Sequence, residues 1–308
     1  MMEPRGQELI KRYKANYGIP VDSVITEEMI LKHWELEKHL RKELLESTPD
    51  NRWEVFERCY SKLYGELGWL TQLSHTERNE PPSVVYGNWI DVIGPPPMQV
   101  YEVGSGKAEL IRYLASCGFE CKTAEITPER GEKWVSPHPN LSWGVSDGVH
   151  LDRFEPTDFY DVVISINVIE HLHPDDLFDH SRGVFSVLSS GGRYIFATPH
   201  VSAGPSDISR VFRRDTPMGM HLKEYTYCEI ARLLKQAGFK HIHSILRSPM
   251  KVRRLFGGHM KAKVSSSHMA YLCVVEKLIR ALPTQELRRK ASKLILFAPN
   301  IMVVAKKA

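Results

Sequence analysis

The stretch Val100-Tyr-Glu-Val-Gly-Ser-Gly-Lys-Ala-Glu-Leu110 decides the fold of this chain. A β-type run ends in Glu102, and Gly104 and Gly106 then make a tight turn into a helical pattern that begins near Lys107. Glycine is needed where a backbone turns sharply and lies directly against a nucleotide-like ligand. A dinucleotide fingerprint would require a third glycine at Glu109, so a nicotinamide cofactor is disfavoured. The motif therefore predicts a ligand-binding loop between a strand and a helix.

Strand-like and helical segments alternate on the carboxyl side of this motif. Strand, helix, strand in this order predicts parallel pairing with right-handed crossovers, and hence an α/β, doubly wound sheet of about seven strands. The expected strands are 99–103, 120–125, 161–166, 193–197, 241–246 and 300–306, and the expected helices include 109–117, 175–188 and 227–237.

Four sections follow from these patterns. Residues 1–80 are predicted to form an N-terminal helical cap, residues 81–246 the core, residues 247–299 a basic helical insert or lid, and residues 300–308 the final core strand. The cap carries an apolar stripe at helical spacing. In one interpretation the stripe only packs the cap on the core, and in another it also lines a substrate pocket. That stripe consists of Trp53, Phe56, Tyr60, Leu63 and Tyr64.

Composition excludes several classes of protein. The chain is 42% hydrophobic and 25% charged, and no apolar run approaches the ~20 residues of a membrane span. Its first residues lack the apolar core of a secretory signal, and its 5 cysteines have no disulfide-like or metal-binding spacing. A net charge of +4 does not by itself suggest nucleic acid. We therefore expect a cytoplasmic protein with reduced thiols.

Positive charge is concentrated in the insert. About twelve Lys and Arg residues lie between Arg247 and Lys293, against only Glu276 and Glu286. One interpretation is a lid with a solvated basic face. Another is contact with an anionic substrate or a membrane surface. RNA is a third possibility, which the lack of an aromatic and basic platform disfavours. The candidate contact residues are Arg253, Arg254, Lys261 and Lys263.

Further motifs follow the glycines at regular intervals. Glu125 ends the second expected strand, Ser146-Asp147-Gly148 comes next, and 160–172, 188–196 and 221–239 complete the series. Together these segments resemble class I S-adenosylmethionine-dependent methyltransferases, and in particular the small-molecule O-methyltransferases of the ubiquinone-biosynthesis type. The resemblance covers residues 95–246 and implies a Rossmann-like fold. Two positions depart from the family pattern: Ala108 replaces a third glycine, and Ser190 replaces a proline.

The resemblance implies S-adenosyl-L-methionine as the cofactor. Glu125 corresponds to the acid that binds both ribose hydroxyls, because a carboxylate accepts two hydrogen bonds. Asp147 corresponds to the acid that contacts the adenine amine. The implied cofactor-binding residues are Glu102, Gly104, Ser105, Gly106, Glu125, Ile126, Asp147, Gly148 and Asn167.

The acceptor chemistry is expected in the loop after the fourth strand. A hydroxyl acceptor benefits from a general base, and the candidate catalytic residues are His171, His200 and Glu170. Related enzymes carry an E-x-x-E-H metal motif here. Glu170, His171 and His200 would be its remaining ligands, but Asn167 replaces the first acid, so no metal is expected.

The sequence thus predicts methyl transfer to a hydroxyl of a small molecule such as a sugar, a glycolipid or a secondary metabolite. Two alternatives stand beside it: a non-catalytic, methyltransferase-like binding protein, and an RNA methyltransferase. The oligomeric state is not predicted.

Overall fold

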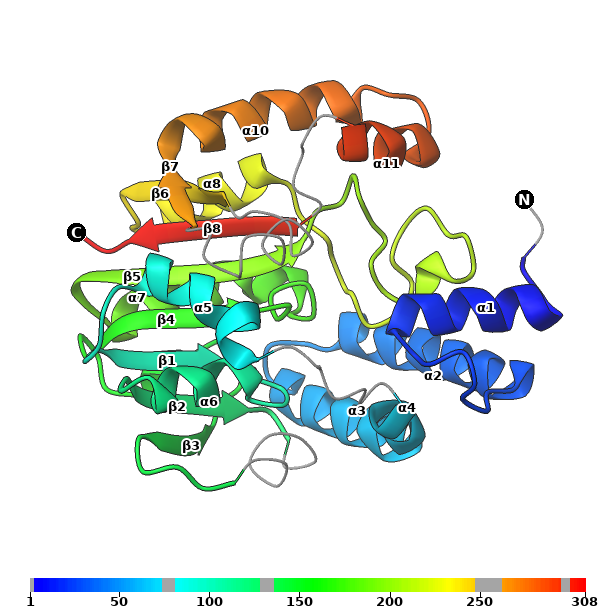
Figure 1. Cartoon of the computed structure of the whole chain (residues 1–308), viewed down its shortest axis with the longest axis horizontal. Helices are drawn as coiled ribbons and strands as arrows, with labels where there is room; N and C mark the ends of the chain where they lie inside the picture. The colour runs from blue at the N-terminus through cyan, green and yellow to red at the C-terminus, as the bar shows by residue number, and fades with distance from the viewer. Residues whose placement is uncertain (1–2, 74–80, 128–135, 247–261, 295–299) are drawn as a thin grey trace.

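The glycine motif follows strand β1 (Gln99–Val103), which lies inside an eight-stranded sheet of order β3-β2-β1-β4-β5-β8-β6-β7 (Figure 1). This computed structural model describes residues 3–73, 81–127, 136–246, 262–294 and 300–308. β1 through β5 pair in parallel, whereas β8 is antiparallel to both β5 and β6. The other strands are β2 (Glu120–Glu125), β3 (Leu141–Val145), β4 (Tyr160–Ile166), β5 (Leu188–Pro199), β6 (His241–Leu246), β7 (Lys263–Ser265) and β8 (Asn300–Lys306).

Helices cover both faces of the sheet, because successive strand residues point to opposite sides. In β1, Tyr101 and Val103 pack in one apolar cluster with α7, α8 and α10, while Val100 packs in another with α5 and α6. The helices of the core are α5 (Pro82–Ile93), α6 (Glu109–Ser116), α7 (Leu177–Val187), α8 (Tyr227–Gln236), α10 (Ser266–Arg280) and α11 (Gln285–Leu294), with short 3₁₀ turns at Leu151–Arg153, Pro174–Asp176 and Ile208–Arg210.

Four N-terminal helices form a cap beyond the carboxyl ends of the parallel strands (Figure 1). They are α1 (Gly6–Tyr17), α2 (Glu27–Glu46), α3 (Arg52–Glu66) and α4 (Gly68–Leu73). The α2–α3 pair buries its apolar faces against Met220 and Leu222, and the α1–α2 pair packs against Phe212. The segment between β5 and α8 therefore joins the cap to the sheet.

The predicted α/β doubly wound fold is confirmed. β1, β2, β6 and β8 have the bounds that the sequence predicts. At one end of the sheet, β8 enters antiparallel between β5 and β6, and β7 is antiparallel to β6. β3 and β7 were not predicted; β3 is an edge strand that contains Gly144 and only one buried residue, so its hydrophobic pattern is weak.

The described part of the insert packs against the core. Met269, Leu272, Val275 and Ile279 of α10 are buried in the same cluster as α8. Arg253, Arg254 and Lys261 lie outside the described residues, and Lys263 lies in β7. In the part of the chain that the structure describes, no helix is both long and apolar enough to cross a membrane.

Candidate functional site

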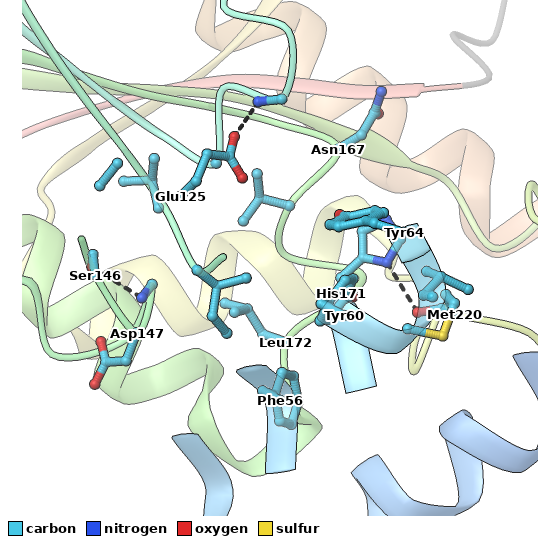
Figure 2. A pocket seen from close by; sticks show the side chains of 18 of the residues that line it. Phe56, Tyr60, Tyr64, Glu125, Ser146, Asp147, Asn167, His171, Leu172 and Met220 are labelled. Carbon is cyan, nitrogen blue, oxygen red and sulfur yellow. Dashed lines mark hydrogen bonds between the residues drawn. The ribbon is translucent and has the colours of Figure 1, made fainter. Parts of the chain in front are cut away.

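A cavity of about 330 Å³ lies at the carboxyl edge of the sheet, between the strands and the cap (Figure 2). The loops after β1, β2, β3 and β4 form one wall, and residues of α1, α2 and α3 with Met220 form the other. Ligands of open α/β sheets bind at this edge, because the loops after parallel strands converge there. We call the wall formed by the loops after the strands the strand wall, and the wall formed by the helices and Met220 the cap wall.

The glycine loop has a backbone that side chains would disturb. Gly104 and Gly106 both adopt left-handed conformations, with φ of 65° and 59°. A Cβ built on Gly104 would lie 2.9 Å from the Cγ2 atom of Val168. The third position of the motif, Ala108, is left-handed as well, with φ 54°. A glycine at that position therefore allows the left-handed backbone as well as leaving space for a ligand. Alanine adopts this conformation only with strain.

Two acidic residues stand on the strand wall. Glu125, at the end of β2, accepts a hydrogen bond from the Gly106 N–H, so the carboxylate and the glycine loop hold each other. Asp147 accepts from the N–H groups of Val149 and His150, at 2.7 and 2.8 Å. These bonds fix both carboxylates in place at the cavity. The predicted residues that line the cavity are Gly104, Gly106, Glu125, Ile126, Asp147, Gly148 and Asn167.

Glu102 and Ser105, also predicted to bind the cofactor, are not among the residues that line the cavity. Glu102 is buried below the loop. Burial, reinforced by the charge of Glu125, raises the pKa of Glu102 to about 8. Its place supports the glycine loop from beneath, and direct contact of Glu102 and Ser105 with the cofactor stays a prediction.

Aromatic side chains form much of the cap wall. Four members of the apolar stripe on α3 line the cavity: Phe56, Tyr60, Leu63 and Tyr64. The three aromatic rings among them are drawn in Figure 2. Trp53, the fifth member, packs on Phe154 instead, with ring centroids 5.1 Å apart. Most of the stripe therefore lines a cavity, and the binding of a substrate there stays a prediction. No sequence pattern marked Tyr17, Glu37 and Met220, which reach the cavity from other elements.

His171 is the one histidine among the described residues that line the cavity. Its Nδ1 lies 3.0 Å from the carbonyl oxygen of Met220 (Figure 2). A carbonyl only accepts, so Nδ1 carries the hydrogen, and in the neutral ring Nε2 keeps its lone pair. The ring packs edge-on against Tyr60 and His221. Of the three predicted catalytic residues, only His171 lines the cavity.

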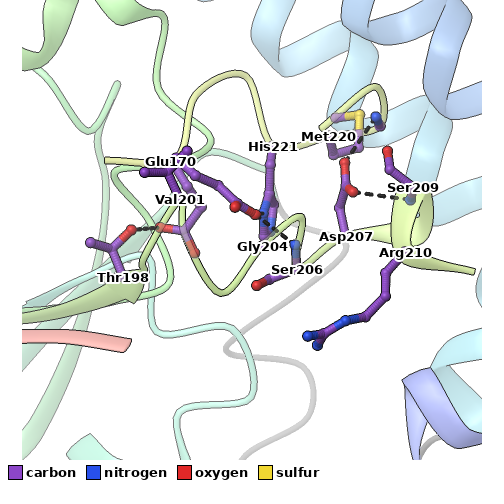
Figure 3. Close-up of polar contacts among 12 residues, drawn as sticks. Glu170, Thr198, Val201, Gly204, Ser206, Asp207, Ser209, Arg210, Met220 and His221 are labelled. Atoms are coloured by element: carbon purple, nitrogen blue, oxygen red, sulfur yellow. Dashed lines mark hydrogen bonds and ion pairs between the residues drawn. The ribbon is translucent and has the colours of Figure 1, made fainter. Parts of the chain in front are cut away.

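Glu170 lies in a buried polar cluster with Thr198 and His221 (Figure 3). Its Oε2 accepts from the Thr198 hydroxyl at 2.9 Å, and burial raises its pKa to about 7. Burial alone would lower the pKa of His221, but the hydrogen bond to Glu224 and the charge of Glu170 outweigh it, so this pKa rises to about 9. His221 is therefore a buried imidazolium between carboxylates at neutral pH.

The same cluster contains a set of metal-ligand types. Glu170, His171 and His221 each offer one ligand atom, and these atoms lie within 4.8 Å of one another. Glu170 Oε1 is buried and has no hydrogen-bond partner within the described residues. The set fits a divalent ion, since carboxylate and imidazole are suitable ligands. It differs from the set considered from sequence, because His221 takes the place of His200.

His200 faces away from this site. It is fully buried, its Nδ1 accepts from the Ser202 N–H, and its Nε2 lies 3.0 Å from Glu276 Oε2. Glu276, on α10, also accepts the Tyr227 and Cys228 N–H groups at the start of α8. His200 thus belongs to a contact between β5, α8 and α10, and its predicted catalytic role is wrong. Its position directly after a strand predicted that it lies at the carboxyl edge of the sheet. That position did not show which neighbouring element its side chain contacts.

The described part of the basic insert does not line the cavity either. Arg289, on α11, donates to the carbonyl oxygens of Gly204 and Arg214. Arg288 donates to that of Leu282. Within residues 262–294 the insert therefore packs on the core and bonds to it. None of these residues forms the expected lid over the cavity.

Comparison with known proteins agrees with this architecture. A family model described as "Methyltransferase domain" matches residues 85–244, just over half of the chain. The chain belongs to this family, that of the class I S-adenosylmethionine-dependent methyltransferases, and its cofactor is S-adenosylmethionine. No curated protein matches the sequence significantly.

Solved structures resemble the chain at the level of the fold. A methyltransferase from Archaeoglobus fulgidus is 20% identical, with 74% of this chain and 95% of that chain covered and a TM-score of 0.49. Phosphoethanolamine N-methyltransferase 2 of Haemonchus contortus, in complex with S-adenosylmethionine, is 15% identical, with 71% and 51% covered and a TM-score of 0.47. The chain spans about half the length of the Haemonchus enzyme.

Proposed function

We propose that this protein transfers a methyl group from S-adenosylmethionine to a hydroxyl of a small molecule bound between the two walls of the cavity. One observation carries the proposal. The strand wall has the glycine loop and Glu125 expected for the cofactor, and His171 lies in the same cavity beside the aromatic cap wall. A volume of about 330 Å³ suits small ligands.

His171 is the base in this proposal. Bound S-adenosylmethionine supplies an activated methyl on a sulfonium, and the C–S bond breaks as the acceptor oxygen bonds to the methyl carbon. Nε2 of His171 accepts the hydroxyl proton, while Met220 holds Nδ1 and so fixes the tautomer. Phe56, Tyr60 and Tyr64 exclude water from the acceptor.

A divalent ion offers a second mechanism at the same place. Held by Glu170, His171 and His221, it would bind the acceptor oxygen and lower the pKa of its hydroxyl. His171 would then act as a ligand and not as the base. We favour the base, because Asn167 leaves the site without the first acidic ligand of the related metal motif.

The charge of the cavity argues against an RNA substrate. Its charged lining residues, among those described, are Glu37, Glu125 and Asp147, and phosphates are recognised by Lys and Arg. We keep contact of the basic insert with an anionic surface as a separate proposal. On α11, Lys290 and Lys293 are exposed to solvent. We also propose a cytoplasmic location, which the five free cysteines suit.

The proposal is tested with methyl-labelled S-adenosylmethionine and a panel of hydroxylated acceptors, including sugars and phenols. We expect label on the oxygen of at least one acceptor class with the wild-type protein, and a large loss of rate with His171→Gln. Binding of S-adenosylhomocysteine without transfer to any acceptor class, hydroxyl or amine, would favour the non-catalytic binding protein. Transfer to RNA, with affinity that falls steeply with salt, would favour the RNA enzyme.

A further inference from the structure

The cap wall contains a buried carboxylate that the methyl-transfer mechanism does not use. Glu37, on α2, lines the cavity, and its side chain is 9% exposed. No Lys or Arg is found among the described residues that line the cavity, so nothing cationic on its walls neutralises this group. A buried carboxylate is costly unless it is paired, and one kept in a ligand cavity that has no Lys or Arg in its described lining points to a ligand of opposite charge.

Hydrogen bonds orient Glu37. Oε1 lies 2.6 Å from His33 Nε2, and Oε2 accepts from the Met220 N–H at 3.0 Å. His33 Nδ1 lies 2.6 Å from the Tyr13 hydroxyl, so Tyr13, His33 and Glu37 form one chain of hydrogen bonds. His33 is buried and is not among the described residues that line the cavity, so this chain holds the carboxylate from behind.

A second carboxylate stands behind the first. A Cβ built on Gly219 would lie 2.3 Å from Glu37 Oε2 and 2.8 Å from Asp207 Oδ2, so the two acids flank one glycine. Asp207 accepts from the Ser209 and Gly219 N–H groups and is itself buried (Figure 3). The cations near Asp207, Arg41 and His221, are outside the cavity lining. Asp207 and these cations therefore lie behind the lining, and Glu37 is the charged group that the described residues of the cap wall present to the cavity.

Aromatic rings stand on the same wall as the carboxylate. Tyr17, Tyr60 and Tyr64 line the cavity with Glu37, and the rings of Tyr60 and Tyr64 are 5.7 Å apart at an angle of 46°. The faces of aromatic rings attract cations, and aromatic cages with a nearby acid recognise ammonium groups. Neither a phosphate nor a carboxylate on the ligand would be accommodated beside Glu37.

We propose that the cap wall binds a cationic group of the acceptor, a protonated amine or a quaternary ammonium, with Glu37 as its counter-ion and Tyr17, Tyr60 and Tyr64 as its aromatic walls. This inference rests on the proposed function, which places the acceptor there, and it adds a substrate class: small molecules that carry both a hydroxyl and a cationic nitrogen.

Met220 sets the length of such an acceptor. Its N–H donates to Glu37 and its carbonyl accepts from His171, at 3.0 Å each. One residue spans at most ~3.6 Å, so the carboxylate oxygen and Nδ1 of His171 are no more than about 10 Å apart, and Nε2, the proposed base, belongs to the same ring. A molecule with the hydroxyl and the nitrogen a few bonds apart reaches both groups at once.

The test compares two probes of nearly identical shape. Choline carries a quaternary ammonium, and 3,3-dimethylbutan-1-ol replaces its nitrogen with carbon. Their dissociation constants are measured by ligand-observed NMR, with and without saturating S-adenosylhomocysteine, on wild type, Glu37→Gln and Glu35→Gln. Glu35 is a matched control, because it lies on the same helix with a 69% exposed side chain.

We expect choline to bind about tenfold or more tightly than the uncharged probe. Glu37→Gln removes this preference and Glu35→Gln keeps it. If Glu37→Gln does not fold, Tyr64→Leu serves in its place and weakens choline alone. Equal binding of both probes, no saturable choline binding, or an unchanged preference in Glu37→Gln overturns the proposal. A folded protein that binds choline but not S-adenosylhomocysteine contradicts the proposed function and leaves the ammonium site standing.

Discussion

The two walls of the cavity are built in different ways. The strand wall depends on backbone: left-handed Gly104 and Gly106, and a carboxylate, Glu125, held by a loop N–H. The cap wall depends on side chains that come from three helices and from Met220. A backbone-built wall suits a ligand that is the same for a whole family, whereas a side-chain-built wall can change with the acceptor while the fold stays constant.

The largest expected effect separates chemistry from cofactor binding. We predict that His171→Gln lowers kcat by ~10²- to 10⁴-fold, because it removes the base, and leaves the affinity for S-adenosylhomocysteine unchanged. The rate is measured with the acceptor that the labelling screen identifies. His200→Gln is the control: it should lower thermal stability and spare kcat, because His200 contacts Glu276 and not the cavity. Equal losses of kcat in the two variants would contradict this assignment.

Gly104→Ala tests the backbone-built wall. The new Cβ would require a left-handed alanine and would press on Val168, so we expect cofactor affinity to fall by about tenfold or more. Gly118→Ala is a matched control, because Gly118 also has a positive φ, of 91°, and its Cβ would meet nothing closer than 3.8 Å. Calorimetric titration should show a loss of affinity in the first variant and only a loss of stability in the second.

A chelator distinguishes the two mechanisms at His171. With this residue as the base, dialysis against EDTA leaves the rate of methyl transfer unchanged. A rate that disappears with EDTA and returns with Mg²⁺ or Mn²⁺ would instead assign Glu170, His171 and His221 to an ion. The control is the affinity for S-adenosylhomocysteine, which neither treatment should change.

Glu102 is buried beneath the glycine loop of the strand wall, and it makes the stability of the protein depend on pH. Its folded pKa of about 8 exceeds the ordinary value of 4.5, so the folded protein keeps a proton that the unfolded chain releases. Its contribution is therefore complete below pH ~4.5 and declines as the pH rises to ~8. We expect Glu102→Gln to reduce the fall in unfolding free energy between pH 5 and pH 8 by roughly 2–4 kcal/mol. Urea unfolding at both pH values measures the free energy of unfolding. An equal change in that free energy between the two pH values in wild type and variant would refute the prediction.

The smallest expected effect concerns the departure from the glycine pattern. Ala108→Gly relieves a left-handed alanine, at some loss of chain entropy, and should stabilise the protein by about 0.5–1 kcal/mol. Ala115→Gly, at a buried position in the last turn of α6, should instead destabilise it by a similar amount. Melting temperatures of the two variants should therefore move in opposite directions.

The contrast between the walls also explains what the sequence could predict. Strand-ending motifs fix where Gly104, Glu125, Asp147 and Asn167 lie, because parallel strands end at one edge and the loops there converge. The apolar stripe of α3 indicated a buried face, and that face borders the cavity.

Other parts of the site depend on contacts distant in the sequence. Glu37 lies 183 residues from Met220, to whose N–H it is bonded, and no local pattern marks such a pair. His200 and His171 follow neighbouring strands and look equivalent in sequence, yet one faces α10 and the other the cavity. The place of β8 between β5 and β6 likewise depends on tertiary packing, which the order of elements along the chain does not show.

The most direct test of the central claim is a calorimetric titration with S-adenosylmethionine and S-adenosylhomocysteine. Wild type is compared with Glu125→Ala, and with Glu120→Ala at the exposed start of the same strand. We expect wild type and Glu120→Ala to bind both ligands alike and Glu125→Ala to bind them far more weakly. A folded wild type that binds neither ligand, or an unchanged affinity in Glu125→Ala, would contradict the assignment of the strand wall to the cofactor.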